Sequence, residues 1–244
     1  MRYIEEALRM KKSEKRGKST NVKYFKKALN FGDTIRYLTL NELKQFFDCI
    51  DHYKHKLMFQ MIYELGCRVG EFVRIQVRHL NFSRSTVFFP AENTKTKYPR
   101  TSYLPKGLMN ELQSMLKQKQ LISKRHKNIR KPDAYVFHPG KRWNTRYTEN
   151  RIRQIFQRYS QKAGLQHSYG QDRLGRKLKM FTVHSLRHSH VMHYTIDHKL
   201  PLPIVQKQVG HKTLKTTSIY LRPSTEKIAQ EYEKVKSLKA HENF

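Results

Sequence analysis

Four short stretches of the sequence carry side chains that could handle a phosphate group. In chain order they are CRVGE (Cys67–Glu71), NTKTK (Asn93–Lys97), HSLRH (His184–His188) and VGHKTLKTTSIY (Val209–Tyr220). Phosphoryl transfer needs a nucleophile in line, hydrogen-bond donors for the charge that develops on the phosphate oxygens, and a proton for the leaving oxygen. Arginine suits the donor role because its planar guanidinium group binds two phosphate oxygens at once. Together, the four stretches indicate chemistry on a phosphate.

Two of these stretches repeat one spacing. His184 and Arg187 are three residues apart, so on a helix they share a face. At the start of a helix they would also lie near its partial positive charge, where an anion is stabilised. Arg68 and Glu71 are also three apart. The Glu71 carboxylate could orient the Arg68 guanidinium, but most such pairs are ordinary surface salt bridges, and the spacing leaves both interpretations open.

In this order, the stretches resemble the active site of the tyrosine recombinase, or phage integrase, family. The family pattern is an arginine, a lysine in a hairpin, H-x-x-R, Gly-His and a tyrosine nine residues after that histidine. Matched by position, the pattern identifies Arg68, Lys95, His184, Arg187, His211 and Tyr220, with Lys97 as the alternative lysine. The resemblance covers roughly residues 37–233, which is most of the chain.

The resemblance implies site-specific DNA strand exchange. Tyr220 would attack the scissile DNA phosphate, form a 3′-phosphotyrosyl bond and release a 5′-hydroxyl. Because the covalent bond keeps the phosphodiester energy, the reaction needs neither ATP nor a metal, and no cofactor is expected. The sequence agrees with this, since it has no G-x-x-x-x-G-K-[ST] pattern.

The other matched residues would serve this reaction. Arg68, Arg187 and His211 would hold the non-bridging oxygens of the phosphate as charge builds on them. Lys95 would protonate the leaving 5′ oxygen, and His184 would help to take the proton from the tyrosine.

The charge balance agrees with a nucleic-acid partner. Of the 244 residues, 50 are Lys or Arg and 19 are Asp or Glu, which gives a formal net charge of +31. A folded domain tolerates such self-repulsion best when an anionic partner relieves it. Nucleic acid is the usual partner because each neutralised phosphate releases condensed counterions. The resemblance to the recombinase family implies that this nucleic acid is double-stranded DNA.

A cytoplasmic location is expected. No apolar run approaches the roughly 18 residues of a membrane-spanning helix, so a membrane partner is not expected. The first ten residues, MRYIEEALRM, lack the apolar core of a signal peptide. The two cysteines, Cys49 and Cys67, form neither a disulfide framework nor a zinc pattern, which fits a reducing compartment.

Three alternatives remain open. A type IB topoisomerase uses similar catalytic groups, but relaxes supercoils as a monomer without choosing a site. A non-catalytic basic DNA-binding protein would explain the charge but not the ordered motifs. A zinc site is the third, because histidines four residues apart on a helix can hold zinc. Four histidines crowd HSLRHSHVMH, yet no H-E-x-x-H pattern is present and no Cys or carboxylate lies nearby to complete the ligands.

Hydrophobic periodicity predicts a mainly helical scaffold for these motifs. Thr39 and Glu42 have the spacing of a capping box, and Gly66 is expected to end the second helix. Helices are expected at 40–50, 57–65, shortly after CRVGE, at 106–122, at 149–163, from about 184 onward and at 203–210.

β-Structure is expected to be limited. A hairpin with arms Thr86–Phe89 and Thr101–Leu104 would carry the lysines at its tip, and 134–137 would be a short strand. Residues 117–131 are expected to form an exposed basic loop, and the segment around Gly170 and Gly175 another loop. The fold class is therefore α+β, mainly α-helical with one small antiparallel sheet, and resembles the catalytic domains of integrases.

The chain is expected to have three parts. These are a basic N-terminal arm (1–36), a catalytic domain (37–223) and a helical tail (224–244), whose apolar side we expect to dock on a neighbouring subunit. The family works as a tetramer on paired sites, so a homotetramer is expected. Family members usually carry an N-terminal helical domain that clamps the other side of the DNA. Either the arm does this in reduced form, a partner supplies it, or the chain is a minimal or truncated relative.

Overall fold

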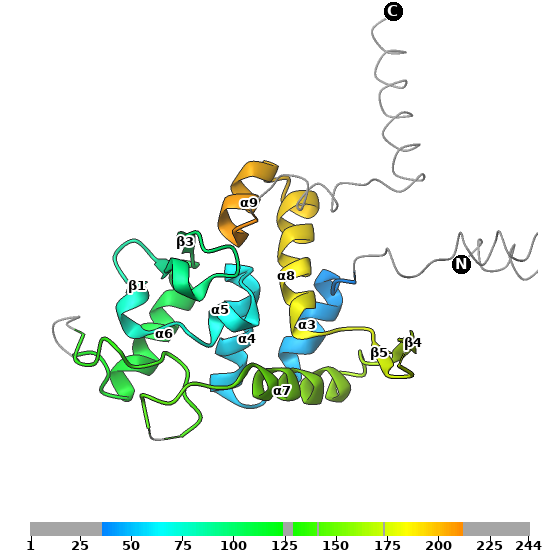
Figure 1. Cartoon of the computed structure of the whole chain (residues 1–244), viewed down its shortest axis with the longest axis horizontal. Coiled ribbons are helices and arrows are strands. Elements are labelled where there is room, and N and C mark those ends of the chain that lie inside the picture. Colours follow the sequence, from blue (N-terminus) through cyan, green and yellow to red (C-terminus); the bar gives the residue numbers. More distant parts are fainter. Residues whose placement is uncertain (1–35, 124–128, 141, 173, 212–244) are drawn as a thin grey trace, which may run out of the picture. The chain divides into compact units, whose positions relative to one another are not determined.

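The computed structural model describes residues 36–123, 129–140, 142–172 and 174–211 (Figure 1). The α-helices are α3 (Leu40–Asp48), α4 (Tyr53–Leu65), α5 (Val69–Phe72), α6 (Lys106–Gln118), α7 (Glu149–Lys162), α8 (Val183–Met192) and α9 (Leu202–Val209). The strands are β1 (Leu80–Asn81), β2 (Thr86–Phe89), β3 (Arg100–Tyr103), β4 (Ser168–Gln171) and β5 (Lys177–Lys179). Each helix predicted between residues 40 and 210 is present. The tail and all of the arm except Arg36 lie outside the described residues, so the three-part division stays a prediction.

Local signals set the ends of the first two described helices. The Thr39 side chain accepts a hydrogen bond from the Glu42 backbone (3.3 Å), and the Glu42 carboxylate accepts one from the Thr39 backbone (2.8 Å). This is the predicted capping box. Gly66 ends α4 in the left-handed conformation (φ 53°), which glycine adopts without steric cost.

Helix α4 lies at the centre of the core. Its buried side chains run from Leu57 to Leu65, and it packs against α6 and α8. An aromatic cluster joins α3, α4 and α7, in which Phe46 lies 5.6 Å from Phe59 and 4.9 Å from Phe156 between ring centroids. The near-continuous apolar sequence of α4 is therefore explained by burial on several sides.

The predicted hairpin forms the main sheet. Strands pair antiparallel in the order β1-β2-β3, with Val87 opposite Ser102 and Phe89 opposite Arg100. Side chains alternate along β2, so Val87 and Phe89 enter the core while Phe88 is exposed. The second arm begins at Arg100, one residue earlier than predicted. The two-residue edge strand β1 was not predicted.

The prediction of a strand at 134–137 was wrong. Of these residues only Tyr135 makes a β-bridge, to Gln76. The backbone N–H of Val136 donates to the Ile75 carbonyl (3.0 Å) and that of Val77 donates to the Ala134 carbonyl (2.9 Å). The segment therefore pairs with the turn after α5 and not with a strand.

The segment around Gly170 and Gly175 is a hairpin, β4–β5, and not the predicted loop. Asp172 closes its turn, because one carboxylate oxygen accepts the backbone N–H groups of Leu174 and Arg176 (2.9 Å each). Gly175 adopts a φ of +75° in this turn. The prediction of an exposed loop at 117–131 was also wrong in part, because α6 includes Lys117 and both Leu121 and Ile122 are buried.

No helix among the described residues is long and apolar enough to cross a membrane. Cys49 and Cys67 are both free thiols, and burial raises the pKa of Cys67 to about 12. A thiol with so high a pKa is unreactive at neutral pH.

Candidate active site

The turn between α4 and α5 positions Arg68. The left-handed Gly66 redirects the chain, and Arg68 then becomes the N-cap residue of α5. The Glu71 carboxylate accepts one hydrogen bond from the Arg68 backbone N–H (3.1 Å) and another from its Nη1 (3.0 Å). Glu71 is only 2% exposed, so this pair is not a surface salt bridge. The carboxylate fixes the orientation of the Arg68 guanidinium.

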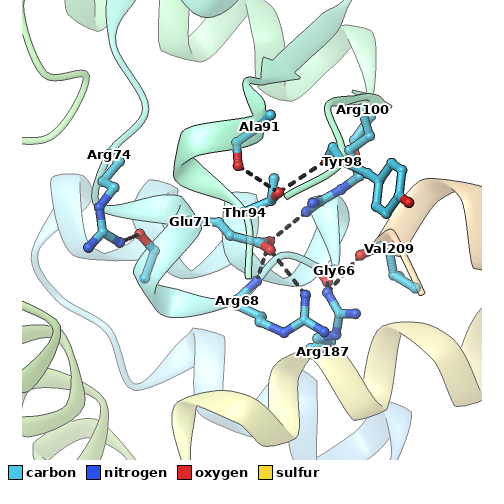
Figure 2. Close-up of polar contacts among 12 residues, drawn as sticks. Gly66, Arg68, Glu71, Arg74, Ala91, Thr94, Tyr98, Arg100, Arg187 and Val209 are labelled. Atoms are coloured by element: carbon cyan, nitrogen blue, oxygen red, sulfur yellow. Dashed lines mark hydrogen bonds and ion pairs between the residues drawn. The ribbon is translucent and has the colours of Figure 1, made fainter. Parts of the chain in front are cut away.

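A second arginine, Arg100, contacts the same carboxylate. Its Nη2 lies 2.6 Å from Glu71 Oε2, and its guanidinium carbon lies 4.2 Å from the centre of the Phe89 ring. Burial alone would raise the pKa of Glu71, but the hydrogen bond and charge of Arg100, the backbone hydrogen bond from Arg68 and the charge of Arg187 together lower the pKa. Figure 2 shows Glu71 between the two arginines.

Arg187 lies on α8 and is almost fully buried, with 1% of its surface exposed. Its Nη1 donates to the carbonyl oxygens of Gly66 (2.6 Å) and Val209 (2.8 Å), so it joins the turn after α4 to the end of α9 (Figure 2). Its Nη2 is buried and has no hydrogen-bond partner among the described residues. Burial, and then the charge of Arg68, lower the pKa of Arg187 to about 10, so it stays charged at neutral pH.

Helix α9 ends beside these arginines and places His211. Gly210 caps the helix in the left-handed conformation (φ 72°), and the buried His211 follows it. Burial is the main cause that lowers the pKa of His211 to about 3, with further contributions from the positive charges of Arg187 and Arg68. His211 is therefore neutral at pH 7 and can donate a hydrogen bond without adding charge.

The chain matches the phage integrase family over residues 36–227. It belongs to that family. The tyrosine recombinase XerA of Pyrococcus furiosus is 25% identical over 204 residues, which are 82% of this chain and 62% of that protein. The crystal structure of a XerA recombinase has a TM-score of 0.60 at 20% identity, with 81% of this chain and 62% of the other covered. That of XerH bound to its difH substrate has a TM-score of 0.56 at 18% identity, with 80% and 52% covered.

These likenesses confirm the predicted fold class. The chain spans about three fifths of the length of its XerA relatives. The relatives are named recombinases, so a topoisomerase is not favoured.

The integrase-family pattern can now be placed on the structure. Arg68, Arg187 and His211 come together, and His184, on the first turn of α8, is also near enough to His211 to affect its pKa. The rings of His184 and His188 pack edge to face, with 4.5 Å between their centroids. Among the described residues, no group of three or more His, Cys, Asp or Glu is placed to hold a metal ion.

The hairpin tip places the two candidate lysines. Lys95 and Lys97 are both exposed, and Lys97 adopts a positive φ of 58°. An open pocket of about 330 Å³ lies between the tip and the end of α9, and is lined by Thr96, Tyr98, Pro99, Arg100, Gly210 and His211. The tip therefore lies beside His211, but the choice between the lysines stays a prediction. Tyr220 lies outside the described residues.

The residue that sequence reasoning missed is Arg100. The available signal was the alternation of the predicted arm, which, extended by one residue to Arg100, puts Arg100 and the buried Ser102 on one face of β3. A charged residue on an inward-facing position needs a buried partner. The sequence could not say that this partner is Glu71.

Proposed function

We propose that this phage integrase family chain is a site-specific DNA recombinase, an enzyme that cuts and rejoins DNA strands through a 3′-phosphotyrosyl intermediate on Tyr220. The observation that carries the proposal is the buried Arg187 guanidinium, whose Nη2 has no partner among the described residues. A buried cation with unused donors is costly unless an anion completes it. A DNA phosphate supplies both the charge and the oxygens.

Arg68, Arg187 and His211 act together on the two non-bridging oxygens. Arg68 is held in place by Glu71, and Arg187 by two backbone carbonyls. Both guanidinium groups are thus oriented before DNA arrives, so little reorganisation is needed as charge develops on the phosphate. The neutral His211 adds a hydrogen bond without increasing the repulsion between the arginines.

The reaction moves one proton at each end of the phosphate. The Tyr220 oxygen bonds to phosphorus while His184 helps to take the phenolic proton. The bond from phosphorus to the 5′ oxygen breaks, and Lys95 at the hairpin tip gives that oxygen a proton, with Lys97 as the alternative. Rejoining runs the same steps backwards from a different 5′-hydroxyl. None of these proposed steps uses ATP or a metal.

Duplex DNA is the proposed partner, and the cytoplasm, where it would meet cellular or host DNA, the proposed location. The formal charge of +31 supports a polyanionic partner. The Tn1549 transposon integrase, which has a similar fold, has been solved in complex with transposon right end DNA.

The proposed assembly is a homotetramer on two paired sites, with residues 224–244 docking on a neighbouring subunit. The stripe of Ile228, Tyr232 and Val235 in the sequence supports this. Deleting 224–244 should leave binding to a single duplex site nearly intact and weaken the paired complex, as measured by sedimentation. Full assembly by the shortened chain would refute this role for the tail.

The function is tested by trapping the covalent intermediate. The chain is incubated in EDTA with nicked duplexes that carry a randomised segment, from which a short fragment with its 5′-hydroxyl diffuses away after cleavage. Rejoining then fails, so a protein–DNA 3′ adduct accumulates and its DNA can be sequenced to find the site. Tyr220→Phe removes only the hydroxyl, so DNA binding should persist while the adduct disappears. Tyr53→Phe is the matched control, because Tyr53 is exposed at the start of α4.

Two results would overturn the proposal. One is adduct formation by Tyr220→Phe at the rate of the unsubstituted chain. The other is the absence of an adduct on every duplex in the randomised set, despite tight binding. A sequence-independent adduct would instead argue against site specificity.

A further inference from the structure

We propose that Arg100 is a positioning residue for strand cleavage. It fixes the lysine-bearing hairpin relative to Arg68 and Glu71 on one side and to His211 on the other. The role depends on the proposed function. Three contacts of this one side chain carry it, with Glu71, with Phe89 and with Gly210, together with the place of Arg100 in the hairpin.

The first contact links Arg100 to Arg68. The Glu71 carboxylate divides its oxygens, because Oε1 accepts from Arg68 Nη1 (3.0 Å) and Oε2 accepts from Arg100 Nη2 (2.6 Å). Oε2 also accepts the Arg68 backbone N–H (3.1 Å). A carboxylate held from two sides cannot rotate without breaking an ion pair. Arg100 therefore fixes the direction in which Glu71 holds Arg68.

The second and third contacts fix Arg100 itself. Its guanidinium lies over the Phe89 ring, an arrangement that is favourable for a cation. Its stem lies so close to Gly210 that a Cβ there would come within 2.6 Å of Arg100 Cδ and 2.8 Å of Nε. Gly210 immediately precedes His211, so the position of Arg100 and the course of the chain into His211 depend on each other.

The fourth observation is the place of Arg100 in the hairpin. Arg100 is the first residue of β3, directly after the tip that carries Lys95 and Lys97. Gln208 of α9 secures the same strand, since its carbonyl accepts the Ser102 hydroxyl (2.7 Å) and its side chain accepts the Tyr103 N–H (2.9 Å). The base of the hairpin is thus connected to Glu71 and Arg68 through Arg100, and to α9 through Gln208.

A positioning role for Arg100 can be distinguished from simple neutralisation of Glu71 by the choice of substrate. If Arg100 only neutralised the carboxylate, its loss would lower stability and slow cleavage of any substrate alike. If it places the hairpin lysine, its loss should matter most when the leaving oxygen needs a proton. A 5′-phosphorothiolate makes this distinction, because its leaving sulfur departs without protonation.

The test compares Arg100→Met with the unsubstituted chain, using single-turnover adduct formation at saturating nicked duplex. On the ordinary phosphate we expect a rate lower by about 10²-fold, the usual effect of misplacing a catalytic group by about 1 Å. DNA affinity should stay within about threefold of that of Arg158→Met, an exposed arginine on α7 that matches the loss of charge. On the phosphorothiolate, Arg100→Met should recover at least tenfold relative to the unsubstituted chain, and Arg187→Met should not.

An equal loss of rate on both substrates, or no loss on either, would overturn the positioning role. If Arg100→Met fails to fold because the buried Glu71 loses one of its two ion-pair partners, the same comparison is made with the double variant Arg100→Met/Glu71→Gln and with Arg100→Lys. Arg100→Lys keeps the charge and should retain part of the rate. An adduct formed by the unsubstituted chain together with unaffected Arg100 variants refutes only this inference, whereas the absence of any adduct refutes the proposed function.

Discussion

Replacement of Gly210 by alanine perturbs the site at its closest contact. Gly210 has a φ of +72° and Gly164, after α7, has a φ of +67°. A side chain in this conformation costs about 1–2 kcal/mol at either position. The two differ in their surroundings, because nothing lies within 4 Å of a Cβ at Gly164, whereas a Cβ at Gly210 would meet Arg100 Cδ at 2.6 Å. Gly164→Ala is therefore a matched control for the backbone term.

The size of the difference follows from the overlap. Carbon atoms pack best at about 3.5–4.0 Å, so Arg100 or the end of α9 must move by about 1 Å. Arg100 cannot give way freely, because its guanidinium is held by Glu71 (2.6 Å) and lies over Phe89. Overpacking of this kind costs about 1–3 kcal/mol. We expect Gly164→Ala to cost about 1–2 kcal/mol and Gly210→Ala about 2–5 kcal/mol.

Thermal unfolding followed by circular dichroism measures both. For a chain of this size, about 1 kcal/mol corresponds to a fall of about 2–4 °C in Tm. Gly210→Ala should therefore lower Tm by several degrees more than Gly164→Ala, and only Gly210→Ala should slow adduct formation. In a chain that already carries Arg100→Ala, adding Gly210→Ala should lower Tm by no more than Gly164→Ala does, since the clashing stem is gone. Equal falls in Tm for the two single variants would show that Arg100 moves aside at no cost, contrary to this reasoning.

Three further outcomes are expected. Arg187→Met should lower the adduct-formation rate by about 10²–10³-fold while changing duplex affinity by less than about tenfold, as measured by single-turnover kinetics and fluorescence anisotropy. Burial lowers the pKa of His190 to about 3, so below about pH 6.5 the unfolded chain binds a proton that the folded chain does not. As pH is lowered below this value, the free energy of unfolding should therefore fall by about 1.4 kcal/mol per pH unit for this histidine. Urea titrations at several pH values should show a weaker dependence of the free energy of unfolding on pH for His190→Phe. Finally, the charge of +31 predicts that log K for duplex binding falls steeply with log salt and less steeply without residues 1–30; a flat salt dependence would contradict a phosphate-dominated interface.

Elements with local signals were predictable from the sequence. The Thr39–Glu42 capping box and the glycine after α4 need only their neighbours in the chain, and both occur as predicted. The β4–β5 hairpin was missed because its strands are polar and largely exposed, so they show no alternation of apolar residues. Its turn depends on hydrogen bonds to one side chain, Asp172, which no hydrophobic pattern reveals.

The site was predictable as a set of residues but not as an arrangement. Arg68, Arg187 and His211 could be named from the order of motifs. The contacts that hold them are distant in sequence: Arg187 reaches the Gly66 carbonyl, and Arg100 reaches Glu71. No local pattern encodes such pairs, because they are decided by how helices pack. For this reason the hairpin was predicted to within one residue, while the role of Arg100 at the start of its second strand was not.

The charges of the cluster connect its stability to its chemistry. Three arginines (Arg68, Arg100 and Arg187) lie around one described carboxylate, Glu71, which pairs with Arg68 and Arg100, while Arg187 forms no ion pair among the described residues. About two positive charges are thus left over in a largely buried place, which destabilises the free chain. In the proposed reaction, a bound phosphate would relieve this repulsion, and would relieve it further as negative charge builds on its oxygens during cleavage. The surplus charge that costs the free protein stability would therefore favour the transition state of the proposed reaction over the bound ground state.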